Sequence, residues 1–312
     1  MQIEGGTTQV IINQIIILFL LMSVGGLARK KGLLNDTIAS GLSGILMHIA
    51  LPALIVVSFI FDFSPTMLRN GILVFGISVI IHGILFLLNK LAFGRYHFDK
   101  RNVFILSGVF PNVGYMGMPF IYAVFGQIGV FYAAIFSIPY TLLLFTYGQD
   151  MFRKEKVATP LLTQIIAHSK KPTILAVAAG MIMFLLSFKL PYTVVTTLSS
   201  LGGLTLPIAM MLVGNSIAQM KIRNVFSDKD VYYGTIVRLI LIPVVTYGVL
   251  HLCSVDATIV NVCVTIEALP MAVAGVIFAQ MYEGDTSFAS KCVVIQHALS
   301  LITIPLILII FN

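Results

Sequence analysis

Long apolar runs separated by short polar loops follow one another along the whole chain. They lie at roughly 10–28, 37–60, 68–93, 102–125 and 128–151 in the first half, and at roughly 173–189, 197–219, 231–252, 258–282 and 288–311 in the second. A membrane helix needs roughly 20 mostly apolar residues, because the bilayer core is about 30 Å thick and a helix rises about 1.5 Å per residue. The pattern therefore predicts an all-α integral membrane protein with about ten transmembrane helices.

The composition excludes a water-soluble domain. Hydrophobic residues make up 58% of the 312 positions and charged residues only 10%, whereas soluble domains carry about 25% charged residues. The net charge of +7 does not indicate a nucleic-acid partner, because the basic residues are confined to short loops and form no basic helix. The lipid bilayer is the partner that this composition predicts.

The distribution of Lys and Arg predicts the orientation. Alternate loops differ sharply, and 16 of the 19 basic residues fall on one side of the predicted spans. Basic loops stay in the cytoplasm. We therefore expect a multi-pass protein of the cell membrane with both termini on the extracytoplasmic side.

Five spans in each half predict an inverted repeat, because an odd number makes the two halves enter the membrane from opposite sides. The first repeat would be residues 1–151 and the second 172–312, with 152–171 as a charged cytoplasmic linker. Prolines recur at corresponding positions: Leu51-Pro52 matches Leu206-Pro207, and Pro119 matches Pro270.

A proline inside a helix removes a backbone donor and clashes with the carbonyl one turn before it. The polar groups freed in this way persist at membrane depth only where protein buries them or an aqueous cavity reaches them. Interrupted helices at matching positions of two repeats therefore indicate a transport site.

The first such stretch is 110–119 in the fourth span, which holds two prolines, two glycines and an amide side chain. We expect a substrate site here, with an anion bound by freed amides at a half-helix N-terminus. The candidates are Asn112, Gly114, Tyr115, Gly117 and Pro119. The alternative is a kinked packing helix whose glycines permit close approach.

The partner stretch in the ninth span contains Glu267, and its residues Pro270 and Met271 are further candidates for substrate binding. A carboxylate at the membrane centre costs about 3 kcal/mol by insertion scales, so it needs protonation, a partner or a cation. One hypothesis is proton or cation coupling at Glu267. The alternative is a protonated carboxyl group hydrogen-bonded to a neighbouring helix.

Further polar residues lie within the spans. Asn215 and Ser216 either line the substrate cavity or form interhelical hydrogen bonds. Gln296 and His297 either take part in ion or proton coupling or are packed, hydrogen-bonded residues. An enzyme is not expected, because the chain has no nucleophile elbow, no H-E-x-x-H pair and no P-loop.

These motifs resemble those of the auxin efflux carrier family. Pro111-Asn112 followed by Met116-Gly117-Met118-Pro119 is similar to the signature of the family's fourth helix. Ala268-Leu269-Pro270 with Phe278, Ala279 and Tyr282 is similar to the signature of its ninth helix, and Arg238 and Pro243 also match. The resemblance covers the whole chain in layout.

The resemblance implies ten helices related in outline to bile acid symporters, with the fourth and ninth helices broken and crossing. The first, second, sixth and seventh helices would form a scaffold, and the other six an elevator-like transport domain, commonly within a homodimer. The implied substrate is a small organic anion, either a dicarboxylate such as malate or malonate or an indole acid. Na⁺, held near Glu267 and Asn112, or H⁺ would be the coupling ion, and no other cofactor is expected. The alternative is a membrane sensor that binds a solute without turnover.

Overall fold

The computed structural model describes residues 7–154, 163, 166, 169–219 and 228–311. Most of the predicted linker 152–171 lies outside the described residues, as do three of the basic residues used for the orientation, Lys156, Lys221 and Arg223. The described part of the chain is helical throughout, apart from loops and one isolated β-bridge.

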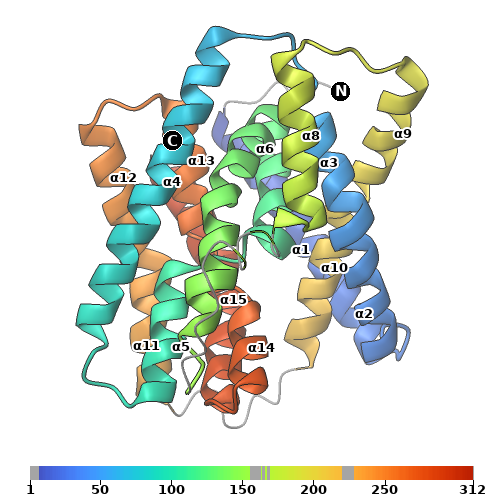
Figure 1. The fold of residues 1–312 in the computed structure, drawn as a ribbon. Coiled ribbons are helices and arrows are strands. Elements are labelled where there is room, and N and C mark those ends of the chain that lie inside the picture. The colour runs from blue at the N-terminus through green and yellow to red at the C-terminus, as the bar shows by residue number, and fades with distance from the viewer. Residues whose placement is uncertain (1–6, 155–162, 164–165, 167–168, 220–227, 312) are drawn as a thin grey trace.

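The first half consists of helices joined by short loops and π-helical turns (Figure 1). Its elements are α1 (Thr7–Lys30), α2 (Asp36–Ile45), η1 (Leu46–Ala50), α3 (Leu51–Val57), α4 (Pro65–Ala92), α5 (Phe98–Val109), η2 (Val113–Gly117), α6 (Met118–Leu143) and η3 (Leu144–Gly148).

The second half has the same character. Its elements are α8 (Pro172–Leu185), α9 (Tyr192–Gly203), α10 (Thr205–Ala218), α11 (Lys229–Ile236), η5 (Val237–Leu241), α12 (Ile242–Leu252), α13 (Ala257–Glu267), α14 (Ala274–Met281) and α15 (Thr286–Phe311).

Within the described residues, 7 helical segments are long and apolar enough to cross a membrane, and two shorter apolar helices, α8 and α13, accompany them. Large apolar side chains cover the outside, including Ile72 at 65% exposure and Leu91 at 70%. Such a surface is stable in contact with lipid and not with water. The structure thus has the character of an integral membrane protein.

Several helices begin where the sequence supplies an N-cap. The side chain of Asn35 accepts a hydrogen bond from the amide of Ile38 at the start of α2, and Ser64 accepts one from Met67 at the start of α4. Asp256 caps α13 in the same way. These side chains satisfy amides that have no acceptor within the first turn.

Glycines allow α1 and α10 to pack with their backbones in contact. A Cβ atom at Gly25 would overlap the backbone of Met211, and one at Gly214 would overlap the backbone of Met22. Small residues at such positions are typical of helix pairs in membranes, where close van der Waals packing drives association.

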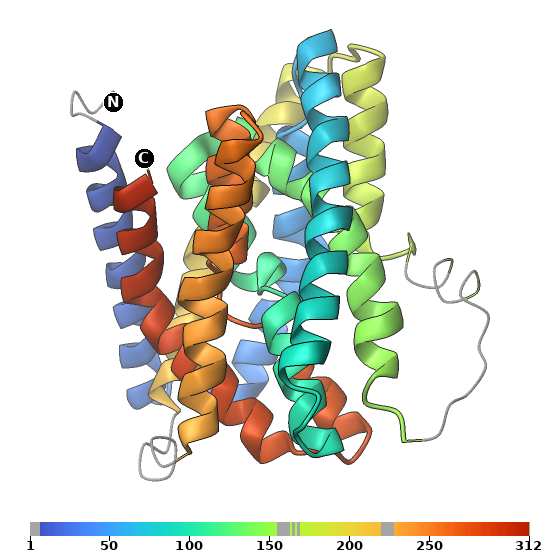
Figure 2. The ribbon, with the colours of Figure 1, turned by 90° about the vertical axis from the view of Figure 1, so that its left-hand side faces the viewer.

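The remaining helices pack in two groups. On one side, α3 contacts α8 and α9, where Gly180 leaves room for the ring of Phe59 and Gly202 for the backbone of Leu54. On the other side, α4 packs against α5 and α6, α12 against α13, and α15 against α11 and α14. Figure 2 shows the longer of these helices running roughly parallel to one another.

π-helical turns precede three prolines at a fixed distance. Each turn ends two residues before a proline: η1 before Pro52, η2 before Pro119 and η5 before Pro243. A proline ring clashes with the carbonyl four residues earlier in a regular α-helix. A wider turn at that point removes the clash, so the sequence position of each proline explains the position of each π-turn.

A further kink divides α6. Gly126 has φ 63° and ψ −153° inside this helix, a conformation that residues with a Cβ atom rarely adopt. The predicted fourth and fifth spans, 102–125 and 128–151, meet at this glycine.

Candidate functional site

Two helix interruptions lie against each other near the middle of the molecule. One separates α5 from η2 and the other separates α13 from α14; α5 and α14 occupy the lower half of Figure 1 and α13 the upper half. The amide of Asn112 donates to the carbonyl of Pro270 at 2.8 Å, and the amide of Ala272 donates to the carbonyl of Phe110 at 2.8 Å. Each interruption therefore satisfies backbone groups that the other leaves without a helical partner.

Close packing supports this pairing. Pro111 and Met271 form the isolated antiparallel bridge, and the hydroxyl of Tyr140 donates to the carbonyl of Pro111 at 2.6 Å. A Cβ atom at Gly117 would lie 2.6 Å from Cδ1 of Leu269. The glycine thus permits η2 to approach the second interruption.

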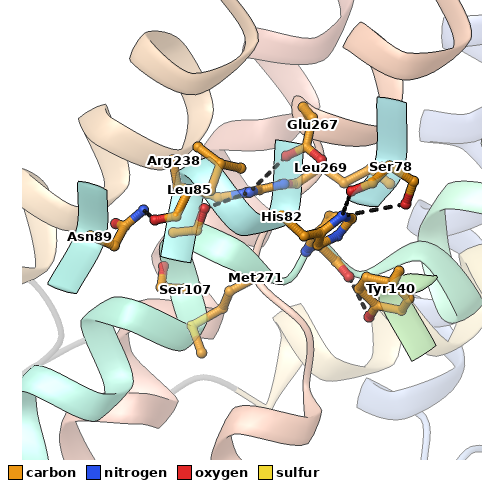
Figure 3. Close-up of polar contacts among 12 residues, drawn as sticks. Ser78, His82, Leu85, Asn89, Ser107, Tyr140, Arg238, Glu267, Leu269 and Met271 are labelled. Atoms are coloured by element: carbon orange, nitrogen blue, oxygen red, sulfur yellow. Dashed lines mark hydrogen bonds and ion pairs between the residues drawn. The ribbon is translucent and has the colours of Figure 1, made fainter. Parts of the chain in front are cut away.

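Arg238 joins the two helix ends that precede the interruptions (Figure 3). Its Nε donates to the carbonyl of Leu269 at 2.8 Å and its Nη1 to the carbonyl of Gly108 at 3.3 Å. These carbonyls lie at the C-terminal ends of α13 and α5, where the last carbonyls lack a helical N–H donor and the helix dipole is negative. A guanidinium group is well suited to this position, because it is always charged and has several donors.

Glu267 is the counter-charge of this arginine. Its Oε2 lies 3.2 Å from Nη1 of Arg238, and both side chains are 0% exposed. Of the two interpretations of Glu267 made from the sequence, neither anticipated a guanidinium partner. The pair explains how the carboxylate is accommodated at membrane depth, since a buried charge must be paired and hydrogen-bonded.

Gln296 holds the second interruption in place from α15. Its Oε1 accepts a hydrogen bond from the amide of Met271 at 3.0 Å, and its Nε2 donates to the hydroxyl of Ser107 at 2.8 Å. Gln296 therefore connects α15 with the end of α5 and with the second interruption.

His297 contacts the amide side chain of Asn112. Its Nδ1 lies 2.7 Å from the carbonyl of Val293, and its Nε2 lies 3.0 Å from Nδ2 of Asn112. A carbonyl only accepts, so the proton is on Nδ1, and Nε2 of the neutral ring accepts from Asn112. One N–H of the Asn112 amide remains for another acceptor.

Two cavities meet at this amide. One of about 330 Å³ lies between α2, α10 and α15, and the other of about 300 Å³ lies between α3, α6 and α14. Asn112, Tyr115 and Val273 line both cavities. Volumes of this size suit a small organic molecule.

The structure divides the predicted site residues into two sets. The cavities are lined by Asn112, Gly114, Tyr115, Asn215, Ser216 and His297. Behind them, buried in protein, lie Gly117, Pro119, Glu267, Pro270, Met271 and Gln296. The second set supports the interruptions and does not line either cavity.

Two charged residues near the site had no site role in the sequence-based prediction. Arg238 was the basic residue placed deepest inside a predicted span, and that position was the signal for a partner of Glu267. Lys171, assigned to the linker, lines the cavity of about 300 Å³. No sequence pattern distinguished it from the neighbouring basic residues.

Comparison with known proteins identifies the family. A family model described as "Membrane transport protein" matches residues 10–308. The chain belongs to this family of membrane transport proteins. The resemblance to auxin efflux carriers, inferred from the two proline motifs, is thereby confirmed.

The relatives of this transport family member are archaeal and bacterial. An uncharacterized transporter of Methanocaldococcus jannaschii is 24% identical over 94% of this chain and 96% of its own length. An uncharacterized transporter of Methanothermobacter thermautotrophicus is 22% identical over 96% of this chain and 97% of its own length. The uncharacterized transporter YfdV of Escherichia coli is 23% identical over 95% of this chain and 96% of its own length. The family and the apolar helices together make this a multi-pass membrane protein.

Proposed function

We propose that this transport family member is a secondary transporter of a small organic anion, such as malate, malonate or an indole acid. The observation that carries the proposal is the pair of helix interruptions with the Asn112 amide between two cavities. Unpaired polar groups beside water-accessible space at membrane depth are what a solute site requires.

An anion has suitable donors at this place. The amides of Gly114 and Tyr115 belong to the first turn of η2, where no acceptor exists within the helix, and both residues line the cavity of about 300 Å³. The positive end of this half-helix favours a carboxylate. The remaining N–H of Asn112 adds a side-chain donor.

We further propose ten crossings arranged as two inverted repeats. The start of α1 and the end of α15 lie at the same end of the molecule in Figures 1 and 2, which an even number of crossings requires. Both termini would be extracytoplasmic. Counting α5 with the first part of α6 and α13 with α14 as single interrupted crossings gives two groups of five.

The two packing groups suggest how such a transporter moves. The group of α1, α2, α3, α8, α9 and α10 corresponds to the scaffold, and α4, α5, α6 and α11 to α15 correspond to the moving domain of an elevator-like mechanism. Both cavities are lined by residues of both groups. We propose that the transporter assembles as a homodimer through the scaffold.

His297 is a better candidate than Glu267 for the residue that couples transport to a proton. Glu267 is paired with Arg238, which opposes Na⁺ by like-charge repulsion, whereas His297 lines a cavity and contacts Asn112. Protonated Nε2 would donate, and the Asn112 amide would turn to present both N–H groups to the anion. A His297→Gln variant should transport without response to a pH gradient, and a response equal to that of the wild type would contradict this.

Counterflow in proteoliposomes tests the function. Vesicles loaded with unlabelled malate, malonate or indole-3-acetate should accumulate the labelled acid, whereas a sensor without turnover would bind it and exchange none. Asn112→Ala should reduce exchange by at least about tenfold, because a hydrogen bond to a charged group contributes about 1.5–3 kcal/mol. The matched control is Asn70→Ala, whose side chain contacts Tyr132 away from both cavities. Unchanged exchange by the Asn112 variant would refute this site.

A further inference from the structure

The cavity of about 300 Å³ has one charged group among the described residues that line it, the ammonium of Lys171. The remaining lining is mostly apolar, and its other side-chain donors and acceptors are the amide of Asn112 and the hydroxyl groups of Tyr115, Ser137, Tyr140, Thr141 and Thr173. None of the described residues that line this cavity is a carboxylate. An entering anion would therefore meet one counter-charge and no repelling charge.

Lys171 is placed so that its ammonium is partly desolvated without a carboxylate partner. It directly precedes α8, is half-buried, and lies over the ring of Phe145, which lines the same cavity. Two other lysines are paired: Lys100 lies 2.8 Å from Asp230 and Lys189 lies 3.0 Å from Asp62. Among the described residues Lys171 forms no ion pair, and burial lowers its pKa to about 8.

We propose that Lys171 is the specificity residue that holds the carboxylate of the transported anion inside this cavity. The proposal rests on the proposed function, since it assigns the counter-charge of the same solute. Asn112 and the η2 amides lie on the lining of the same cavity, so an anion held by Lys171 is kept within reach of the interrupted helices. A cation that burial has already desolvated gains more from an anion than a hydrated surface lysine does.

Binding measurements on the purified full chain test this. The probes are indole-3-acetate and malonate, each compared with its neutral amide, indole-3-acetamide or malonamide. The wild type should prefer the acids, and Lys171→Gln should reduce this preference by about tenfold or more, as expected for loss of a charge-assisted contact. The matched control is Lys170→Gln, because Lys170 is adjacent, exposed and does not line the cavity.

The outcomes are distinguishable. A preference for acids that survives in Lys171→Gln, or that falls equally in Lys170→Gln, overturns the role of Lys171 and leaves the proposed function standing. A wild type that binds and exchanges neither acid overturns both.

A second measurement serves if the Gln variant does not fold. The affinity of the wild type for either acid should fall by up to about tenfold between pH 7 and 9, as Lys171 loses its proton. Lys171→Arg should keep its affinity over this range, because arginine stays protonated. Tyr115 and Tyr140 are the other ionisable side chains among the described lining residues. An equal loss in both proteins would show that Lys171 is not the source of the pH dependence and would overturn the proposal.

Discussion

The side chain with the most connections at the site is Arg238, and its loss should be more damaging than the loss of Glu267. Arg238 donates to Leu269, Gly108 and Glu267, whereas the structure gives Glu267 one of these contacts. Removing the arginine leaves a buried carboxylate and two helix-end carbonyls without a donor, and breaking a buried pair costs about 3–5 kcal/mol. Arg238→Gln should therefore lower the melting temperature in detergent more than Glu267→Gln.

The reason for the difference lies in the helix ends. In Glu267→Gln the remaining cation still faces the negative ends of α5 and α13, which compensate part of its charge. Arg238→Lys tests the charge apart from the geometry, because it keeps the cation and loses the planar donors. Its melting temperature should lie between those of Arg238→Gln and Glu267→Gln. Equal destabilisation by the Arg238→Gln and Glu267→Gln variants would show that the ion pair alone matters.

At the scale of helices, the π-turn before Pro119 holds Asn112 and Tyr115 in their irregular positions. Pro119→Ala removes the clash that the wider turn relieves, so η2 should shift toward a regular helix and withdraw these side chains from the cavities. We expect loss of counterflow with unchanged or increased thermal stability.

A proline at a helix start provides the control for this prediction. Pro65 is in the first turn of α4, where its missing amide would have no helical acceptor. Pro65→Ala should leave the rate of counterflow unchanged and the free energy of unfolding within about 0.5 kcal/mol of the wild type. Counterflow that persists in Pro119→Ala would separate the π-turn from solute binding.

The sequence was sufficient to predict the two interruptions but not what surrounds them. Prolines and glycines act locally, so breaks within 110–119 and around Pro270 could be predicted from residue types alone. The structure places the breaks at 110–112 and 268–273. Arg238 and Lys171 act through contacts between residues that are far apart in the sequence. Arg238 contacts Glu267, 29 positions away, and Lys171 contacts Phe145, 26 positions away. Such contacts depend on helix packing, which hydropathy does not specify. For the same reason, the sequence could not predict which of the candidate residues line the cavities and which are buried behind them.

At the scale of the whole molecule, the proposed elevator requires the two packing groups to move past each other. Phe61, which follows α3, packs against Phe131 of α6 with ring centroids 6.2 Å apart, so this contact joins the groups. Cysteines at these positions, joined by a short bifunctional thiol reagent, should block counterflow. Cys253 is exposed and must first be replaced by Ser, whereas Cys263 and Cys292 are buried.

A link within one group is the control for this block. A Cβ atom at Gly26 of α1 would lie 3.8 Å from Cβ of Ala218 of α10, a separation that a disulfide bridges without strain. The Gly26→Cys, Ala218→Cys pair should therefore form a disulfide and leave counterflow intact, because α1 and α10 move together. If both links permit full exchange, the groups do not slide past each other and the solute crosses by a smaller motion at the interruptions. If both block exchange, movement within the scaffold is also required, and the boundary between the two groups has been drawn in the wrong place.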